Sequence, residues 1–254
     1  MKERSAEDGP AISGSQTAAP DTGRLIGAAL GLGLLAAIAS LGLFTWLADE
    51  VIEGDTQAMD DWLLLGLHDF ATPWLTELMR SASVWGSPSR LAIFGAAAAV
   101  YFLVRGWRRG TVLIGVTLAG GALLDTVLKW TFGRARPIPF FDHYPAPETF
   151  SFPSGHALFS VCFFGGVAAL LSARIRRRAF RVAVWLVAGV IIVLIGVSRV
   201  YLGVHYPSDV IAGYSAGTIW VAAVALADRV AEHRRTRRGL RSEPRASMFN
   251  PPTD

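Results

Sequence analysis

The chain has 254 residues, of which 52% are hydrophobic, and its mean hydropathy is +0.40. This content is too apolar for an ordinary soluble domain and indicates an integral membrane protein. The formal net charge is +4, and only Lys2 and Lys129 among the 24 basic residues are lysines.

The single cysteine, Cys162, excludes an intrachain disulfide and a zinc site of the cysteine type. The five histidines do not form metal-ligand spacings such as HxxxH or HExxH. We therefore expect a mechanism that needs no metal and no cofactor.

Residues 1–24 are rich in Ser, Ala, Pro, Gly and Asp, which predicts a disordered N-terminal tail. The polar lead is long, and the apolar run that follows exceeds a signal-peptide core, so we do not expect a secretory signal. Residues 25–47 form that run and predict the first transmembrane helix.

The connection from Asp49 to Arg90 carries eight acids against two arginines. Within it, Trp62 to Trp85 mixes large apolar and polar residues at helical spacing. This predicts an amphipathic helical region at the membrane interface, at about residues 57–87. A part in substrate entry is a further hypothesis for the same region.

Five further apolar runs complete the bundle. Leu91 to Val104 is short enough for a re-entrant segment, but arginines and interfacial aromatics flank it, which favours a full span. The others are residues 111–132, 152–173, 182–197 and 210–227. The sequence thus predicts an all-α integral membrane six-helix bundle over residues 25–228, followed by a basic tail, 229–254.

The arginines set the expected orientation. They cluster after the second span, after the fourth span and in the C-terminal tail, which are three segments on one side of a six-span chain. The positive-inside rule makes that side cytoplasmic, together with both termini. This topology explains the basic tail without a nucleic-acid partner.

The first stretch with chemical potential is KWTFGRARP, residues 129–137. Lys129, Arg134 and Arg136 place three positive charges at the end of one span, where repulsion is unfavourable unless an anion neutralises them. Asp125, one turn before Lys129, offsets only part of this charge. Interfacial anchoring is the alternative explanation.

The second stretch is FPSGH, residues 152–156. Pro153 suits the first turn of a helix, and Gly155 lets the backbone approach a ligand closely. The free N–H groups of that turn and the helix dipole favour an anion there. His156 would lie beside that anion as a proton donor.

The third stretch is SRVYLGVHYPSD, residues 198–209. His205 and Asp209 are four residues apart, so the carboxylate can fix the imidazole tautomer and leave the other nitrogen as a nucleophile or base. Arg199 supplies a planar fork suited to a phosphoryl group. Taken alone, a snorkelling arginine and an interfacial histidine also explain this stretch.

Together, Lys129 with Arg136–Pro137, then Pro153 to His156, then Ser198–Arg199 with His205 and Asp209, resemble the tripartite signature of the type 2 phosphatidic acid phosphatase superfamily. The resemblance covers about residues 91–227. It implies a metal-independent integral membrane phosphatase acting on lipid phosphates at the outer leaflet.

The resemblance also implies residue roles. His205 corresponds to a nucleophile that forms a phosphohistidine, Asp209 to its orienting partner and His156 to the general acid. Contacts to the substrate phosphate fall to Lys129, Arg136, Arg199, Ser154 and Gly155. Arg134 and Asp125 are further site candidates, and the role of Arg134 stays open.

We expect a lipid phosphate or diphosphate as substrate: undecaprenyl diphosphate, phosphatidylglycerol phosphate or phosphatidic acid. The expected location is a bacterial inner membrane, with the site facing the periplasm or outside. A lipid phosphotransferase using the same phosphohistidine is one alternative, and a membrane transporter or scaffold is another. Six apolar spans argue against a soluble vanadium haloperoxidase.

Overall fold

The structure is a computed structural model that describes residues 22–141 and 148–242, with side chains for 31–141 and 148–236. All regular structure in these ranges is helical. The helices are α1 (Thr22–Glu53), α2 (Gln57–His68), α3 (Pro73–Trp85), α4 (Pro88–Val104), α5 (Arg108–Phe132), α6 (Gly155–Ser160), the π-helical η1 (Val161–Gly165), α7 (Gly166–Ser172), α8 (Arg178–Tyr201) and α9 (Pro207–Ser242). The tail predicted for residues 1–24 lies mostly outside the described residues.

Five helical segments are each long and apolar enough to cross a membrane: Gly31–Glu53, Arg108–Phe132, Gly155–Ser172, Arg178–Tyr201 and Pro207–Thr236. Helices α3 and α4, bent by 53° relative to each other, meet the same criterion as a pair. A helix suits this environment because it satisfies its backbone hydrogen bonds internally where no water is present. The all-α membrane bundle predicted from the sequence is confirmed, with five or six spans.

The prediction of one amphipathic helical region at 57–87 needs a correction, because two helices occupy it. Helix α2 ends at His68, and α3 begins at Pro73, where the missing N–H of proline costs no helical hydrogen bond. Helix α4 begins in the same way at Pro88.

Two further expectations about helix ends were wrong. Pro153 is not in a first helical turn, because α6 begins two residues later at Gly155. The span predicted at 182–197 ends too early, because α8 continues to Tyr201 and includes Arg199. The buried Arg199 guanidinium donates a hydrogen bond to Ser83 on α3.

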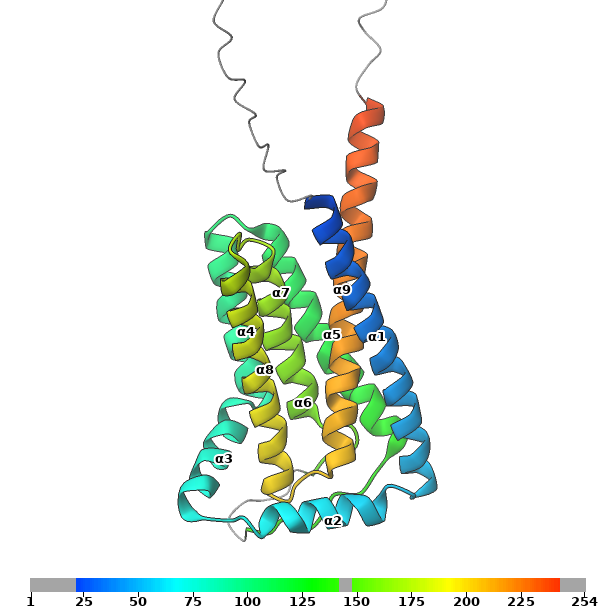
Figure 1. Ribbon diagram of the computed structural model, residues 1–254, viewed down its shortest axis with the longest axis vertical. Coiled ribbons are helices and arrows are strands. Elements are labelled where there is room, and N and C mark those ends of the chain that lie inside the picture. The colour runs from blue at the N-terminus through cyan, green and yellow to red at the C-terminus, as the bar shows by residue number, and fades with distance from the viewer. Residues whose placement is uncertain (1–21, 142–147, 243–254) are drawn as a thin grey trace, which may run out of the picture.

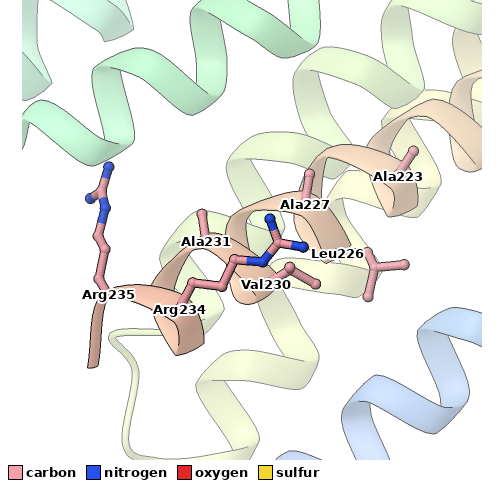
Figure 2. Close-up of a pocket in the computed structure, with 7 residues that line it drawn as sticks. All are labelled: Ala223, Leu226, Ala227, Val230, Ala231, Arg234 and Arg235. Carbon is pink, nitrogen blue, oxygen red and sulfur yellow. The ribbon is translucent and has the colours of Figure 1, made fainter. Parts of the chain in front are cut away.

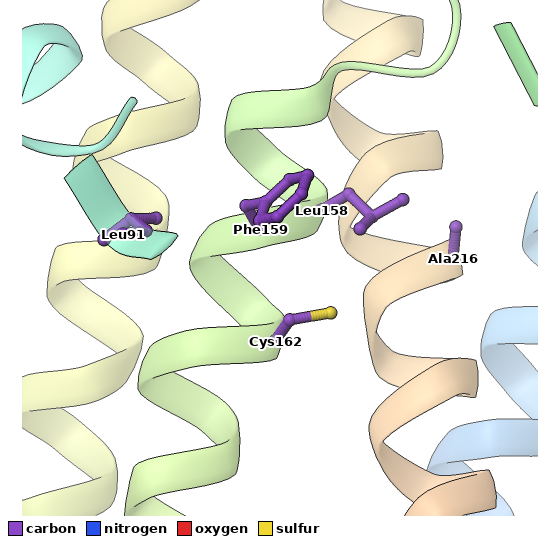
Figure 3. Packing of buried hydrophobic residues seen from close by; sticks show 5 residues of the cluster. All are labelled: Leu91, Leu158, Phe159, Cys162 and Ala216. Atoms are coloured by element: carbon purple, nitrogen blue, oxygen red, sulfur yellow. The ribbon is translucent and has the colours of Figure 1, made fainter. Parts of the chain in front are cut away.

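The segment Gly155–Ser172 is the central helix of the bundle. In its most apolar window 56% of residues are buried, against 33% or less in the other four spans. Its side chains Leu158, Phe159 and Cys162 pack with Leu91 of α4 and Ala216 of α9 in one hydrophobic cluster (Figure 3). Large apolar side chains on the outer faces, such as those of Ile93 and Val190, are exposed, which suits contact with lipid.

The two ends of the bundle differ in architecture. At one end α2 lies across the bundle, below the end of α5, the start of α6 and the α8–α9 link (Figure 1). At the other end lie the arginine-rich α4–α5 and α7–α8 links, with the start of α1 and the end of α9 (Figure 1). The three predicted phosphate-binding stretches therefore share the end that α2 covers.

Candidate active site

Backbone hydrogen bonds join the three stretches directly. The N–H of Ser154, just before α6, donates to the carbonyl of Asp209 in the first turn of α9 at 2.9 Å. The N–H of Ser151 donates to the carbonyl of Arg134 at 2.8 Å. An added Cβ at Gly213 would lie 2.5 Å from the Ser154 carbonyl oxygen, so this glycine lets α9 approach the start of α6. The convergence expected from the sequence is present.

His205 lies in the link between α8 and α9, and its side chain is almost fully buried. Arg136 Nη1 and His205 Nε2 are 2.9 Å apart, and because a guanidinium can only donate, Nε2 is the acceptor. The proton of the neutral ring is then on Nδ1, which lies 3.4 Å from Asp209 Oδ2. The lone pair of the neutral ring is therefore on Nε2, where it accepts the hydrogen bond from Arg136.

The Asp209 carboxylate is completely buried and held by three donors besides His205. Its Oδ1 accepts from Arg134 Nη1 at 2.8 Å. Its Oδ2 accepts from the backbone N–H of Tyr206 at 2.9 Å and from the Ser151 hydroxyl. Such contacts fix the plane of the carboxylate, and with it the orientation of the imidazole.

Lys129 is a buried ammonium in the last turn of α5. It forms an ion pair with Asp125, one turn earlier, and donates to the carbonyl oxygen of Pro153 at 3.0 Å. An added Cβ at Gly155 would lie 3.2 Å from Lys129 Nζ and 2.9 Å from Asp125 Oδ1. The absence of a side chain at Gly155 thus brings the start of α6 against this pair.

Arg136 binds neutral groups among the described residues. Its nitrogens donate to the carbonyl oxygens of Thr149, Phe150 and Val204, to the Thr149 hydroxyl and to His205. Burial and the positive charge of Arg199 lower the pKa of Arg136 to about 10. The guanidinium remains charged near neutrality, with no carboxylate among these hydrogen-bond partners.

The same charges act on His205. Burial, followed by the positive charges of Arg136, Arg199 and Lys129, holds the pKa of His205 well below its usual value. The imidazole is therefore neutral across the physiological range, as a nucleophile requires.

Two members of the PSGH stretch complete the site. The Ser154 hydroxyl is fully buried and has no hydrogen-bond partner within the described residues, which leaves it available to a ligand. His156 lies in the first turn of α6 and is only partly buried. It is two residues after Ser154, whose N–H donates to the Asp209 carbonyl.

Comparison with known proteins identifies the family. A profile described as the PAP2 superfamily matches residues 110–231. Phosphatidylglycerophosphatase B of Bacillus subtilis is 33% identical over 184 residues, which are 69% of this chain and 86% of the relative. This chain belongs to the PAP2 superfamily.

Two further comparisons agree with PAP2 membership. An undecaprenyl-diphosphatase of Sulfolobus acidocaldarius is 29% identical over 167 residues, covering 64% of this chain and 74% of the relative. The crystal structure of a transmembrane PAP2 type phosphatidylglycerolphosphate phosphatase from Bacillus subtilis is similar with a TM-score of 0.68 and 31% identity. That similarity covers 76% of this chain and 96% of the solved one. The matched range 110–231 contains every site residue predicted above.

Sequence reasoning missed several polar residues of this PAP2 site. Ser151 directly precedes the FPSGH stretch, and its position beside that motif is a signal that could have found it. Asp60 and Ser83 carry no such signal, because they lie on α2 and α3, outside all three stretches.

The two cavities described elsewhere in this PAP2 chain are not lined by predicted site residues. One, of about 680 Å³, lies along the C-terminal half of α9 (Figure 2) and is lined by Ala223, Leu226, Ala227, Val230, Ala231, Arg234 and Arg235. The other, of about 390 Å³, lies between α5, α7 and α9 near Trp107. Over the described ranges, no three His, Cys, Asp or Glu side chains are placed to hold a metal ion.

Proposed function

We propose that this lipid phosphatase of the PAP2 superfamily removes a phosphoryl group from a lipid phosphate through a phosphohistidine formed at His205. The observation that carries the proposal is the state of the His205 ring. Its Nε2 accepts a hydrogen bond from Arg136, its Nδ1 faces Asp209, and its pKa is held low. A neutral, oriented imidazole among cations suits attack on a phosphoryl group.

In the first step, the lone pair of His205 Nε2 forms a bond to phosphorus while the phosphorus–oxygen bond to the lipid breaks. The departing oxygen takes a proton from His156. Lys129, Arg136 and Arg199 stabilise the negative charge on the phosphoryl oxygens, and Ser154 and Gly155 add contacts to them. Asp209 stabilises the positive charge that develops on the imidazole.

In the second step, His156 accepts a proton from water, and the resulting hydroxide attacks phosphorus. The phosphorus–nitrogen bond breaks, which releases inorganic phosphate and restores neutral His205. The two steps balance as hydrolysis, with one water consumed and the proton returned to His156.

Phosphatidylglycerol phosphate is the first substrate to test. Of the two relatives described above, the phosphatidylglycerophosphatase B is matched over the larger share of its length, 86%. The similar solved structure is that of a phosphatidylglycerolphosphate phosphatase. Undecaprenyl diphosphate follows from the second relative, and phosphatidic acid from the shared phosphomonoester chemistry.

The test is phosphate release by detergent-purified protein from each of these three lipids, with EDTA present. We expect hydrolysis of at least one lipid by the wild type and none by His205→Ala. The matched control is His233→Ala, which removes an exposed imidazole from α9 and should leave the rate unchanged. Activity that requires an added divalent metal, or that survives in His205→Ala, would contradict the proposal.

Product analysis separates the alternatives. Transfer of the phosphoryl group to an added lipid or sugar acceptor, in preference to water, would indicate a phosphotransferase. Binding of the lipid by the wild type without phosphate release would indicate a transporter or scaffold.

We assign residues 25–228 to the catalytic domain, in a bacterial inner membrane, with both termini in the cytoplasm and the α2 end facing the periplasm or outside. The arginine-rich links at the opposite end support this orientation through the positive-inside rule. Cysteines introduced at exposed Asp61 on α2 and exposed Arg177 before α8 test it in a Cys162→Ser background. An impermeant maleimide applied to intact cells should label only the cysteine at position 61, and labelling only at position 177 would reverse the topology.

A further inference from the structure

Asp60 is a fully buried carboxylate on α2, and the reaction proposed above does not use it. It lies outside the three phosphate-binding stretches, on the helix that crosses the end of the bundle (Figure 1). An isolated buried carboxylate is costly, so the partners of Asp60 indicate what it stabilises.

One set of partners is the start of α9. Asp60 Oδ1 accepts from the backbone N–H of Ser208 at 2.9 Å, and its Oδ2 accepts from the Ser208 hydroxyl at 2.6 Å. The first N–H groups of a helix have no partner within the helix, and the helix dipole favours a negative charge beside them. Asp60 therefore ties α2 to the turn that carries Asp209.

The other partner is Arg134, whose role the sequence left open. Arg134 Nη2 donates to Asp60 Oδ2 at 2.8 Å, while Nη1 donates to Asp209 Oδ1 at 2.8 Å. One guanidinium thus bridges two buried carboxylates. Its remaining contacts are the Ser208 hydroxyl at 2.7 Å, Thr56 Oγ1 and Gln57 Oε1 at 3.3 Å each, and the Tyr206 ring, whose centroid is 4.3 Å from Cζ.

We propose that Asp60 is a positioning residue that acts through Arg134 to orient Asp209, and through Asp209 the His205 nucleophile. This inference rests on the proposed function. The planar fork of Arg134 places Nη1 on Asp209 Oδ1, and among the three acceptors of Nη2 Asp60 is the nearest, at 2.8 Å against 3.3 Å for Thr56 and Gln57, and the only charged one. Oδ2 of Asp209 is then left for Ser151, the Tyr206 N–H and the Nδ1 side of His205.

The same arrangement explains why α2 belongs to the catalytic apparatus. Asp60 and Asp209 are both negative and Arg134 is positive, so the three form an alternating buried row. Removing one charge from such a row leaves the others incompletely compensated, which disturbs geometry more than a surface contact would.

The test compares Asp60→Asn, Arg134→Lys and the double variant with the wild type in single-turnover hydrolysis. The enzyme is in saturating excess over phosphatidylglycerol phosphate, or over whichever of the three lipids the wild type hydrolyses. Under these conditions the first-order rate constant does not depend on the fraction of enzyme that is folded, so lost stability alone does not change it. Asp61→Asn is the matched control, because Asp61 is the next residue along α2 and is exposed.

We expect Asp60→Asn and Arg134→Lys each to lower the single-turnover rate constant by about 10- to 100-fold. When the enzyme concentration is varied, the concentration that gives half the maximal rate should stay within about two-fold of the wild type. The double variant should fall within about three-fold of Arg134→Lys alone, because the two residues act as one unit. Asp61→Asn should match the wild type.

A wild-type rate constant in Asp60→Asn would overturn the inference, whatever the melting temperature. If Asp60→Asn does not fold, a wild-type rate constant in Arg134→Lys would overturn it equally. These outcomes differ from failure of the proposed function, in which His205→Ala itself retains activity.

Discussion

Gly155→Ala is the smallest change that should disturb the phosphate site. The added methyl group would lie 2.9 Å from Asp125 Oδ1, 3.2 Å from Asp125 Oδ2 and 3.2 Å from Lys129 Nζ. At least one of these atoms has to move by several tenths of an ångström. Movement of Lys129 is restricted, because its ammonium is also bound to the Pro153 carbonyl at 3.0 Å.

The magnitude follows from two opposing terms. Overpacking a buried site costs about 1–3 kcal/mol, whereas replacing a helical glycine by alanine gains about 0.5–1 kcal/mol. Gly115→Ala on α5 is the matched control, because nothing lies within 4 Å of a Cβ at Gly115 and only the gain applies. We therefore expect Gly155→Ala to melt below Gly115→Ala.

Activity should be more sensitive than stability to this substitution. A misplacement of about 1 Å in a group that stabilises the transition state can cost about 100-fold in rate. Initial rates of phosphate release and thermal melting in the same detergent measure the two effects for each variant. The reasoning is refuted if Gly155→Ala equals Gly115→Ala in both rate and melting temperature.

Three other predictions concern pH, anion binding and the far end of the bundle. Because attack requires a neutral His205 and the pKa of His205 is held low, the acid limb of the kcat/KM profile should lie well below pH 6.5. Arg136→Gln removes one of the positive charges that lower this pKa, so the limb should move to higher pH with the same substrate. A limb that does not move would count against His205 as the group that must be neutral. Inorganic phosphate at about 100 times its Kd should stabilise the wild type by about 2.7 kcal/mol, which is measured as a higher Tm. The same phosphate concentration should raise the Tm of Arg136→Gln by less. Equal increases in Tm would show that Arg136 does not bind the anion. The partly exposed guanidinium of Arg109 binds Asp228 and Glu232 and should contribute at most about 1 kcal/mol to the free energy of unfolding. Arg109→Gln should therefore lower Tm slightly and leave kcat unchanged. A tenfold loss of kcat would indicate that this end of the bundle is coupled to the site.

The bundle and the meeting of the three stretches could be predicted because both depend on signals spread over many residues. Each span is a long apolar run, and the number of crossings between two motifs decides whether they share a side of the membrane. A boundary error of four residues changes neither result. Helix α8, for example, extends to Tyr201 instead of Val197, and the α8–α9 link still lies beside α2 (Figure 1).

The contacts that α2 makes could not be predicted in the same way. Asp60 is one of eight acids in the connection between Asp49 and Arg90, and its sequence context does not distinguish it from exposed Asp61. Its partner Ser208 is 148 residues away, so only the folded chain brings them together. By contrast, the break between α2 and α3 had a local signal in Pro73, which the predicted single amphipathic region passed over.

The charge of the site also depends on pairing, which a count of arginines misses. The sequence groups Lys129, Arg134 and Arg136 as one positive cluster, but the structure divides them. Asp125 pairs with Lys129, and Asp60 and Asp209 pair with Arg134.

Arg136 differs from both, because the hydrogen bonds described for it go to neutral groups, and the nearby charge of Arg199 helps to lower its pKa to about 10. Positive charge is therefore concentrated beside His205 Nε2, the atom proposed to attack. A phosphate dianion placed there would relieve the repulsion between Arg136 and Arg199. In the proposed mechanism, the pairing of Arg134 with Asp60 and Asp209 leaves Arg136 as the cation beside the attacking nitrogen.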